Sequence, residues 1–407
     1  MFYKPNFRPV SLPHDPFKAI VSPRPIGWIS TINKDGSANL APYSFFNAIG
    51  HKPPMVIFSK TGPKLGITEE KDSIVNIRET GEFVVNFVSF ELTDQMKSIL
   101  SWEEAEEVTF ECEPGTLSEK KLETIKGFGV TRLSLGVENF NDHILETNGR
   151  AHRSKEVFRA YEFARGLGFD NINIDLISGM LEETDENWSD SVDQVIELSP
   201  DCVTIYQMEV PFNTGIFKKM KEEGKLNAPV ADWPTKRRWV KEAYAKLEAS
   251  GYTVTSAYTA VKNPKTTKFI YRDRLWAGAD MIGLGVSSFG HLGGIHYQNI
   301  THIDNYCDIV ESNKLPIRRA LMTKEDERFI RELILQWKLG RVSQKTFIDK
   351  FGISISERFS SILLEWEKKG DLTINGDEFL LTRDALLRVD SLLHGFFLPE
   401  HQDARYV

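Results

Sequence analysis

The cysteines are the residues whose spacing says most about the chemistry of this chain. Its 407 residues contain three of them, and Cys112, Cys202 and Cys307 lie about ninety or more positions apart. No CxxC, CxxxCxxC or Cys-to-His spacing that could hold zinc or an iron–sulfur cluster occurs in the sequence. The pattern therefore favours three reduced, mostly buried thiols over a metal centre.

Two histidines form a second candidate site. His291 and His296 flank the glycine-rich segment GHLGGIH. Imidazole is a common ligand of metal ions and of haem iron. A histidine pair in a glycine-rich loop can equally be an ordinary structural feature. The spacing leaves ligation and a purely structural role both open.

Hydroxyl and cationic residues near the N-terminus could bind a phosphate. Ser44 lies in NLAPYSFFNAIG, and Lys71 and Ser73 lie in KDSIVNI, close to the start of a predicted helix. Hydroxyls, a cation and the N–H groups of a helix start are the groups that bind phosphate. The preceding segment SPRPIGWIST could supply an apolar wall for a flavin ring. The alternative is a hydrophobic barrel core with a polar loop.

Composition narrows the class of protein. The hydrophobic fraction of 41% and the charged fraction of 27% are typical of a globular protein. No run approaches the roughly 20 apolar residues of a membrane span, and the first residues have no signal-peptide core. The net charge of -8 argues against a general nucleic-acid binder. We expect a cytoplasmic protein without membrane or nucleic-acid partners.

The elements that position these residues change in kind along the chain. Residues 1-98 have short β-branched and aromatic runs separated by turn signals, with one helix near 71-80, which predicts a small antiparallel barrel. An acidic connector follows at 99-107. Residues 108-230 alternate strands and helices, which predicts four parallel strands with helices outside. Ser118 and Thr184 or Asp185 are the expected helix N-caps.

The remaining third of the chain is less regular. Residues 231-321 are mixed α and β, and 280-294 is predicted as a strand that runs into a glycine-rich loop. Residues 322-400 are helical and then contain a hairpin with the turn NGD, a pattern that predicts a winged-helix-like domain. Its balanced charges favour a packing role over DNA binding. Its expected core residues are Trp337, Phe347, Phe359 and Trp366.

The N-terminal segment resembles a known family. PFKAIVSPRPIGWISTINKDGSANLAPYSFFNAIG and KDSIVNIRETGEFVVN are similar to the flavin reductase-like, FMN-binding split-barrel family, up to about residue 90. The resemblance implies FMN and a homodimer through the split barrel. It covers only the first half of that domain. The residues that it implies for the flavin and its phosphate are Ser30, Thr31, Ala41, Pro42, Tyr43, Ser44, Phe45, Lys71, Asp72 and Ser73.

From Val108 onward the chain resembles another family, the oxygen-independent coproporphyrinogen III oxidase-like branch of the radical SAM superfamily. The matching segments include ECEPGTLSEKKL, GVTRLSLGVENFND, NGRAHR, GFDNINIDLISGM and CVTIYQMEVPFNT. The resemblance implies contacts of Glu111 with the amino group of S-adenosylmethionine, and of Arg150 and Asp175 with its nucleoside and carboxylate. Glu138, which stands where the family usually has glutamine, is the fourth residue of this implied S-adenosylmethionine site. Tyr206, in CVTIYQMEV, is expected in the barrel core.

The chain departs from this family where the chemistry begins. The family binds a [4Fe-4S] cluster through CxxxCxxC and carries a Gly-Gly-Thr-Pro motif on the next strand, and this chain has neither. The family's HNLNYW-type segment is not reproduced near KFIYRDRLW. Without a cluster there is no electron to cleave S-adenosylmethionine. The cluster and S-adenosylmethionine are therefore not expected, whereas haem or a porphyrin fits the resemblance.

The sequence thus predicts a multi-domain α+β and α/β protein. It comprises a partial FMN-binding split β-barrel, a truncated radical SAM-type β/α barrel, an α+β extension and a C-terminal winged-helix-like domain. The function expected is an FMN-binding oxidoreductase-like protein fused to a degenerate coproporphyrinogen III oxidase-like module, flavin-dependent if it is an enzyme. One alternative is a non-catalytic carrier of haem or porphyrin. Another is a radical SAM protein by descent whose iron–sulfur site is lost or supplied externally. A third is a junction of two incomplete genes.

Overall fold

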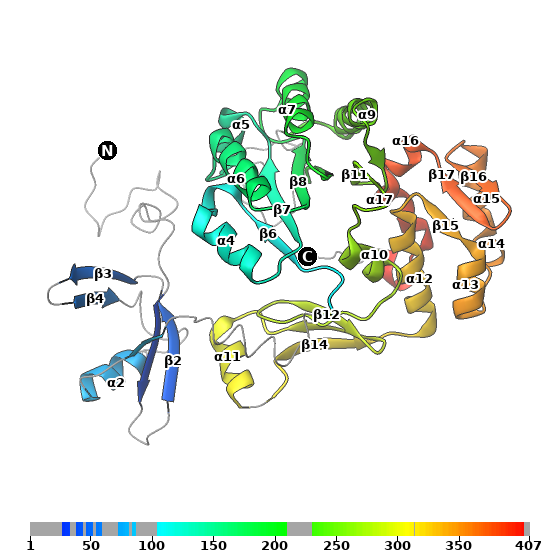
Figure 1. Cartoon of the computed structure of the whole chain (residues 1–407). Coiled ribbons are helices and arrows are strands. Elements are labelled where there is room, and N and C mark those ends of the chain that lie inside the picture. Colours follow the sequence, from blue (N-terminus) through cyan, green and yellow to red (C-terminus); the bar gives the residue numbers. More distant parts are fainter. Residues whose placement is uncertain are drawn as a thin grey trace, which may run out of the picture. The chain divides into compact units, whose positions relative to one another are not determined.

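The computed structural model divides into two compact units, Met1–Trp102 and Glu103–Val407. It describes residues 27–32, 38–43, 46–51, 54–58, 72–80, 84–86, 104–209, 230–312 and 314–402. Figure 1 shows the elements by label.

The described part of the first unit is antiparallel β-structure with one helix. Strands β1 (Gly27–Ile32), β2 (Ala38–Tyr43) and β5 (Val84–Asn86) form a sheet in the order β2-β1-β5, and β3 (Phe46–His51) pairs with β4 (Pro54–Phe58). The amide of Asn76, on helix α2 (Asp72–Thr80), donates a 3.0 Å hydrogen bond to Thr31 on β1. The expected strands and the helix near 71-80 are confirmed.

The second unit is built on a six-stranded sheet in the order β10-β11-β9-β8-β7-β6. The strands β6, β7, β8 and β9 are parallel, as the alternating pattern predicted, and β6 is the edge strand. Their bounds are β6 Thr109–Cys112, β7 Arg132–Glu138, β8 Asn171–Ser178 and β9 Cys202–Gln207. The short antiparallel strands β10 (Thr253–Val254) and β11 (Thr259–Val261), which were not predicted, extend the sheet beyond β9.

Helices line the outer side of this sheet, because every second strand residue is apolar and faces them (Figure 1). On β7 these residues are Leu133, Leu135 and Val137, each completely buried. The helices are α4 (Glu119–Gly127), α5 (Asp142–Thr147), α6 (Ser154–Gly166), α7 (Asp185–Leu198) and α9 (Trp233–Ala249), with the 3-10 turn η1 (Pro114–Thr116) before α4. Ser118 caps α4 and Thr184 caps α7, so Asp185 is the first residue of α7.

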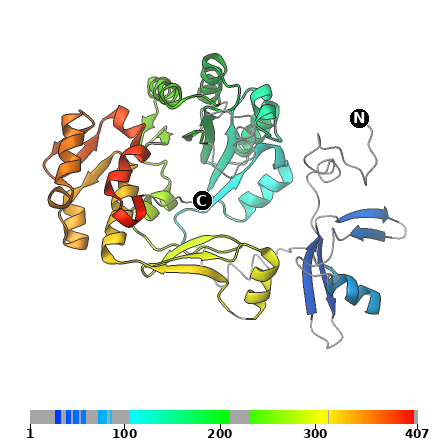
Figure 2. The same ribbon diagram turned by 180° about the vertical axis from the view of Figure 1, so that it is seen from behind.

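The extension contains helix α10 and a separate antiparallel sheet, β12-β13-β14, whose far end carries helix α11 (Figure 2). The prediction for 280-294 was wrong in its order. The glycine-rich loop comes first and the strand follows it, while Met281 makes only an isolated bridge to His291. Bounds are α10 Ile270–Trp276, β12 Phe289–Leu292, β13 Ile295–Asn299, α11 Ile303–Glu311 and β14 Ile317–Met322.

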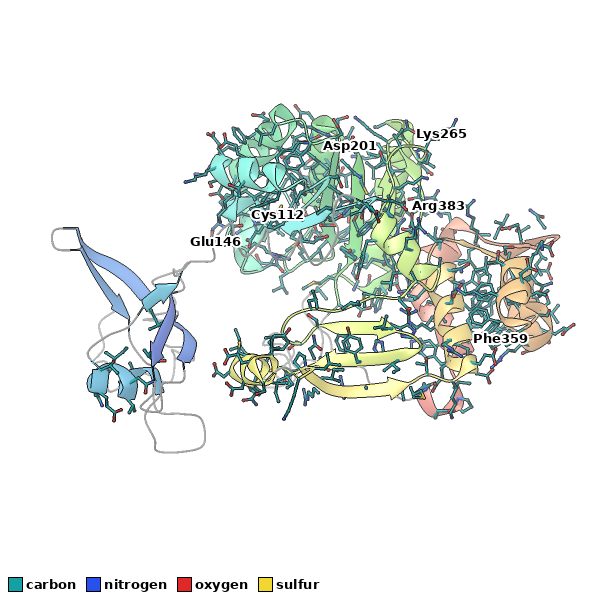
Figure 3. The ribbon with its side chains drawn as sticks, turned by 60° about the horizontal axis from the view of Figure 1, so that its bottom comes forward. Cys112, Glu146, Asp201, Lys265, Phe359 and Arg383 are labelled. Carbon is teal, nitrogen blue, oxygen red and sulfur yellow. The ribbon has the colours of Figure 1, made fainter. Side chains whose placement is uncertain are left out.

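The C-terminal part has its own apolar core and a three-stranded sheet in the order β15-β17-β16. Trp337, Phe347 and Trp366 are buried in this core, as expected. Phe359, labelled in Figure 3, is partly buried and packs against the same core. The NGD turn joins β16 to β17, with Asn375 opposite Glu378. The winged-helix assignment itself stays a prediction. Bounds are α12 Glu325–Trp337, β15 Arg341–Ser343, α13 Gln344–Phe351, α14 Ile355–Arg358, α15 Ser360–Lys368, β16 Leu372–Asn375, β17 Glu378–Leu381, α16 Arg383–Leu386, α17 Val389–Leu393, η2 His394–Phe396 and α18 Pro399–Gln402.

Candidate functional site: an acidic pocket and an aromatic, basic cavity

The inner face of the parallel sheet is polar. Strand residues that alternate with the apolar set point away from the helices, and hydrogen bonds link them across strands. Ser134 donates to Asp175 at 3.0 Å, and Asn173 donates to Asp175 at 2.9 Å. Thr204 in turn donates to Asn173 at 2.8 Å. This network fixes the carboxylate of Asp175 on the inner face of β8.

The four residues expected to contact S-adenosylmethionine line one open pocket at the carboxyl ends of β6, β7 and β8. Its volume is about 410 Å³. Ligands of parallel α/β sheets bind at this end of the strands. The structure thus brings Glu111, Glu138, Arg150 and Asp175 together. The other lining residues are Cys112, Glu113, Gly136, Ile177 and Tyr206.

Glu138 is held in an unusual backbone conformation. It has a φ of 66° and follows a bulge at which β7 slips against β8. Its carboxylate lies 2.8 Å from the guanidinium of Arg150. Burial raises the pKa of Glu138 to about 7, although Arg150 acts in the opposite direction. The side chain can therefore hold or release a proton near neutral pH.

The other carboxyls of the pocket also have raised pKa values. Burial is the main cause for Glu111, and repulsion from Asp175 adds to it. Burial likewise raises the pKa of Asp175, against its hydrogen bonds from Asn173 and Ser134. A pocket crowded with carboxylates favours a cationic group such as an ammonium.

A second, larger cavity of about 830 Å³ opens between the inner face of the sheet, α9, α10 and the C-terminal helices. Its volume lies within the range of about 300–1,000 Å³ that is usual for small-molecule sites. Aromatic rings and cations dominate its wall. The lining residues are Thr204, Tyr206, Gln207, Glu209, Trp233, Arg237, Tyr258, Thr259, Phe269, Arg272, Trp276, Lys338, Leu387, Arg388, Asp390, Ser391 and His394.

The aromatic rings of this cavity are packed against one another. Tyr258 stacks on Tyr206 at 6.1 Å between ring centroids and meets Trp276 edge-on at 6.4 Å. The guanidinium of Arg272 lies 5.0 Å from the Trp276 ring. Such contacts fix ring orientations and leave flat apolar faces beside positive charge. The wall is suited to a flat, anionic molecule.

The cations differ in how far their charge is already paired. Lys338 lies 2.9 Å from Asp390, and Arg272 lies 2.7 Å from Asp273. Arg388 is paired with Asp371. Arg237 has no hydrogen bond or ion pair within the described residues, and its Nε is buried. Burial and the nearby Arg388 lower the pKa of Arg237. Arg237 is thus a cation that an anionic ligand could satisfy.

Tyr206 lies in the walls of both cavities and corrects one expectation. It was expected in the barrel core, but 48% of its surface is exposed, and this surface faces the two cavities. Desolvation, helped by the carboxylates Asp175 and Glu111, raises its pKa to about 12. The residue therefore stays a neutral phenol between the acidic pocket and the basic cavity.

The structure describes only some of the ten residues that are expected to bind FMN. Thr31 and Ser73 are buried in the first unit, with 3% and 2% of their surfaces exposed. The backbones of Ser30, Ala41, Pro42, Tyr43 and Asp72 are described, whereas Ser44, Phe45 and Lys71 lie outside the described residues. The ten expected residues remain a prediction.

The histidine pair lies on β12 and β13, away from both cavities. His291 and His296 are opposite each other in the ladder, with ring centroids 6.0 Å apart. Burial, followed by the charge of Arg331, lowers the pKa of both. Within the described residues, no three histidine, cysteine or acidic side chains gather as a metal site would need. Ligation and a purely structural role of this pair both stay untested hypotheses.

Comparison with known proteins supports both resemblances. The family model for the radical SAM superfamily matches residues 85–195, and the model for the flavin reductase like domain matches residues 21–129. The chain is 29% identical to the heme chaperone HemW of Bacillus subtilis over 72% of this chain and 76% of that protein. It is 24% identical to the oxygen-independent coproporphyrinogen III oxidase of Pseudomonas aeruginosa, over 74% of this chain and 65% of that protein.

The fold is similar to that of a solved radical SAM enzyme. Coproporphyrinogen III oxidase (HemN) from Escherichia coli superposes with a TM-score of 0.61 at 21% identity, over 71% of this chain and 69% of that one. The described part of the chain has no helix long and apolar enough to span a bilayer. Two resemblances therefore meet in one chain, and their matches overlap at residues 85–129.

The cysteines do not fit the cluster that this fold implies. Cys112 is on the edge strand β6, Cys202 is buried on β9 and Cys307 is on α11 of the extension. Burial raises the pKa of Cys112 to about 12 and of Cys202 to about 11, which opposes the thiolate form that iron requires. No step through a [4Fe-4S] cluster is derived for this chain.

The lining of the larger cavity suits a porphyrin or haem. These are flat aromatic macrocycles with carboxylate side chains, and the described lining residues offer rings, four cations and one imidazole. Sequence reasoning missed this set because it comes from α9, β11, α10 and the α16–α17 region, far apart in the chain. The available signal was the recurrence of Trp, Arg and Tyr at Trp233, Arg237, Tyr258, Arg272 and Trp276 within the irregular segment.

Proposed function

We propose that the second unit binds a carboxylated tetrapyrrole, such as haem, in the aromatic, basic cavity, and that it does so without radical chemistry. The observation that carries this proposal is the wall of the 830 Å³ cavity, in which flat rings lie beside four cations. The relatives include a heme chaperone and an oxygen-independent coproporphyrinogen III oxidase. Both names refer to tetrapyrroles, which supports the same ligand class for this chain.

The residues suggest a division of labour in the cavity. Trp276 and Tyr258 would contact the faces of the macrocycle through their rings. Arg237, whose guanidinium has no hydrogen bond or ion pair within the described residues, would pair with a propionate carboxylate. Arg272, Lys338 and Arg388 would add positive potential. Their contribution would be smaller, because Asp273, Asp390 and Asp371 offset part of their charge.

In this proposal the acidic pocket binds a ligand and takes no part in catalysis. Glu111, Glu138, Arg150 and Asp175 could still bind the ammonium and carboxylate of S-adenosylmethionine or of a related amino-acid nucleoside. Reductive cleavage of the bound molecule would need a cluster, which the cysteines of this chain do not fit. Binding without cleavage is therefore what we propose for this pocket.

The first unit would bind FMN, as its match to the flavin reductase like domain suggests. Bound FMN supplies hydride and single-electron transfer. Of the residues expected to bind it, Thr31 and Ser73 have described side chains, and both are buried. Added FMN should gain a protein-bound absorbance spectrum and lose fluorescence. If FMN passes through a desalting column unbound, this part of the proposal fails.

The tetrapyrrole proposal is tested by titration of the full-length protein with haem. We expect a Soret shift that saturates at one haem per chain. Arg237→Ala should weaken binding by roughly tenfold to a hundredfold, which is the usual value of a hydrogen bond to a charged group. Arg238→Ala is the matched control, because Arg238 is the next residue of α9 and pairs on the outside with Asp185 at 2.7 Å. Equal loss in both variants, or no Soret shift in the wild type, would contradict the proposal.

A further inference from the structure

The aromatic, basic cavity contains one imidazole among its described lining residues, that of His394. His394 begins the 3-10 turn η2, directly after α17. Neither of its ring nitrogens takes part in a hydrogen bond or ion pair with the described residues, and its ring centroid lies 5.0 Å from that of Phe397. The imidazole is therefore available to a ligand, and the lone pair of a neutral imidazole is a strong metal donor.

The backbone at His394 is firmly held although the side chain is exposed. The flanking residues Leu393 and Phe396 are 3% and 1% exposed and belong to the C-terminal core. The ring of Phe396 meets those of Phe359 and Trp366 edge-on at 4.9 Å and 5.2 Å. A ligand that is presented by a packed turn loses little freedom when it binds a metal, so its position is largely preorganised.

The other side chains of the cavity are poorer ligands for iron. The hydroxyl of Tyr258 is already 2.5 Å from Asp390, and burial together with that carboxylate raises its pKa. Tyr206 also stays protonated, because desolvation raises its pKa to about 12. None of the three cysteines lines this cavity. Asp390 is engaged by Lys338 as well as by Tyr258.

The wall that carries His394 also carries cations. Arg388, six positions earlier, lines the same cavity, and Arg237 and Trp233 line it from α9. A flat macrocycle could therefore present its carboxylates to the cations and its metal to the imidazole within one cavity. Carboxylate pairing alone would bind metal-free and metal-containing tetrapyrroles equally. An imidazole in the wall would favour the iron form.

We propose that His394 is an axial ligand of haem iron in this cavity, so that the site selects iron tetrapyrroles over metal-free porphyrins. This inference rests on the proposed function, because it assumes that the cavity binds a tetrapyrrole. It adds a residue and a selectivity that ring packing and charge do not supply.

The test compares haem with metal-free protoporphyrin IX on the full-length protein. We expect the wild type to bind haem more tightly than the metal-free compound. His394→Ala should change the Soret and charge-transfer bands and weaken haem binding by roughly tenfold or more, since an iron–nitrogen bond is lost. Binding of metal-free protoporphyrin IX, followed by fluorescence, should be unchanged. Added imidazole should restore the wild-type bands in His394→Gly.

His401→Ala is the control, because His401 is nearby in sequence, lies 3.6 Å from Glu327 and does not line the cavity. If His394→Ala binds haem with the wild-type spectrum and affinity while both tetrapyrroles bind, the ligand assignment is wrong and the proposed function stands. If the wild type binds neither compound, the proposed function fails and the assignment falls with it.

Discussion

At the scale of single residues, the acidic pocket is defined by the cost of burying charge. Glu138, Glu111 and Asp175 all have raised pKa values because burial disfavours their ionised forms. One cation of the pocket wall, Arg150, lies 2.8 Å from Glu138 and offsets part of this cost. Natural proteins keep such costly clusters where a ligand repays them, which supports a retained ligand site in this pocket.

Glu138 should make stability depend on pH in a defined direction. Its pKa is raised from 4.5 in the unfolded chain to about 7 in the folded one, so the folded state binds more protons between these values. The stability that Glu138 contributes is therefore present below pH 4.5 and is lost as pH rises to about 7. Glu138→Gln removes this loss. Relative to wild type, the variant should gain up to about 3 kcal/mol in free energy of unfolding across this window.

Urea denaturation at a series of pH values measures this difference. Glu146→Gln provides a control, because the Glu146 carboxylate is exposed and lies on α5, outside the pocket. A difference between Glu138→Gln and wild type that stays flat between pH 4.5 and 7 would show that the carboxyl does not carry the shifted proton.

At the scale of elements, sequence patterns predicted the strands, helices, caps and turns that depend on nearby residues. The alternation of strands and helices from Val108 onward, the caps at Ser118 and Thr184 and the NGD hairpin are all found. The loop at 280-294 was predicted with the wrong order, because glycine-rich apolar runs do not show on which side the strand lies. β10 and β11 were missed because strands of two and three residues are too short to show a period.

The conformation of the loop that follows β8 requires a glycine at position 179. Gly179 has a φ of 92°, and a Cβ there would lie 2.4 Å from Cδ of the buried Lys236. The backbone N–H groups of Gly179 and Met180 donate to Glu183, which closes the loop. Gly179→Ala should therefore lower the free energy of unfolding by more than about 1 kcal/mol, through strain and the clash.

Gly127 is the matched control for this substitution. It is the last residue of α4, and a Cβ there would have no atom within 4 Å. Gly127→Ala should be neutral or stabilise the protein by up to about 1 kcal/mol, because alanine favours the helix. Thermal unfolding of the two variants should shift the melting temperature in different directions. A Gly179→Ala protein as stable as wild type would contradict the strain.

At the scale of the whole molecule, the candidate site could be predicted only in part. The four residues of the acidic pocket were found because strand ends of one parallel sheet meet at one edge, and the family motifs give their positions. The cavity with Arg237, Trp276 and His394 was not found, because regions far apart in the chain form its walls, among them β9, α9, α10 and residues 387–394. Contacts between elements distant in sequence leave no local pattern, so tertiary structure was needed.

The positions of the cysteines in the whole molecule decide whether this chain could carry out radical chemistry. A radical SAM reaction needs three close thiolates, and the chain has three cysteines on β6, β9 and α11. We expect anaerobic reconstitution with iron and sulfide to leave neither stoichiometric non-haem iron nor acid-labile sulfide on the protein after desalting. No 5′-deoxyadenosine should form from S-adenosylmethionine and dithionite.

Coproporphyrinogen III oxidase from Escherichia coli, treated in parallel, is the positive control, because it is a radical SAM enzyme of the same fold. Four irons per chain in this protein, with cleavage of S-adenosylmethionine, would mean that ligands other than a cysteine triad hold a cluster. The fold would then have kept its chemistry. Absence of iron would agree with the function that we propose for the second unit, which is binding without radical chemistry.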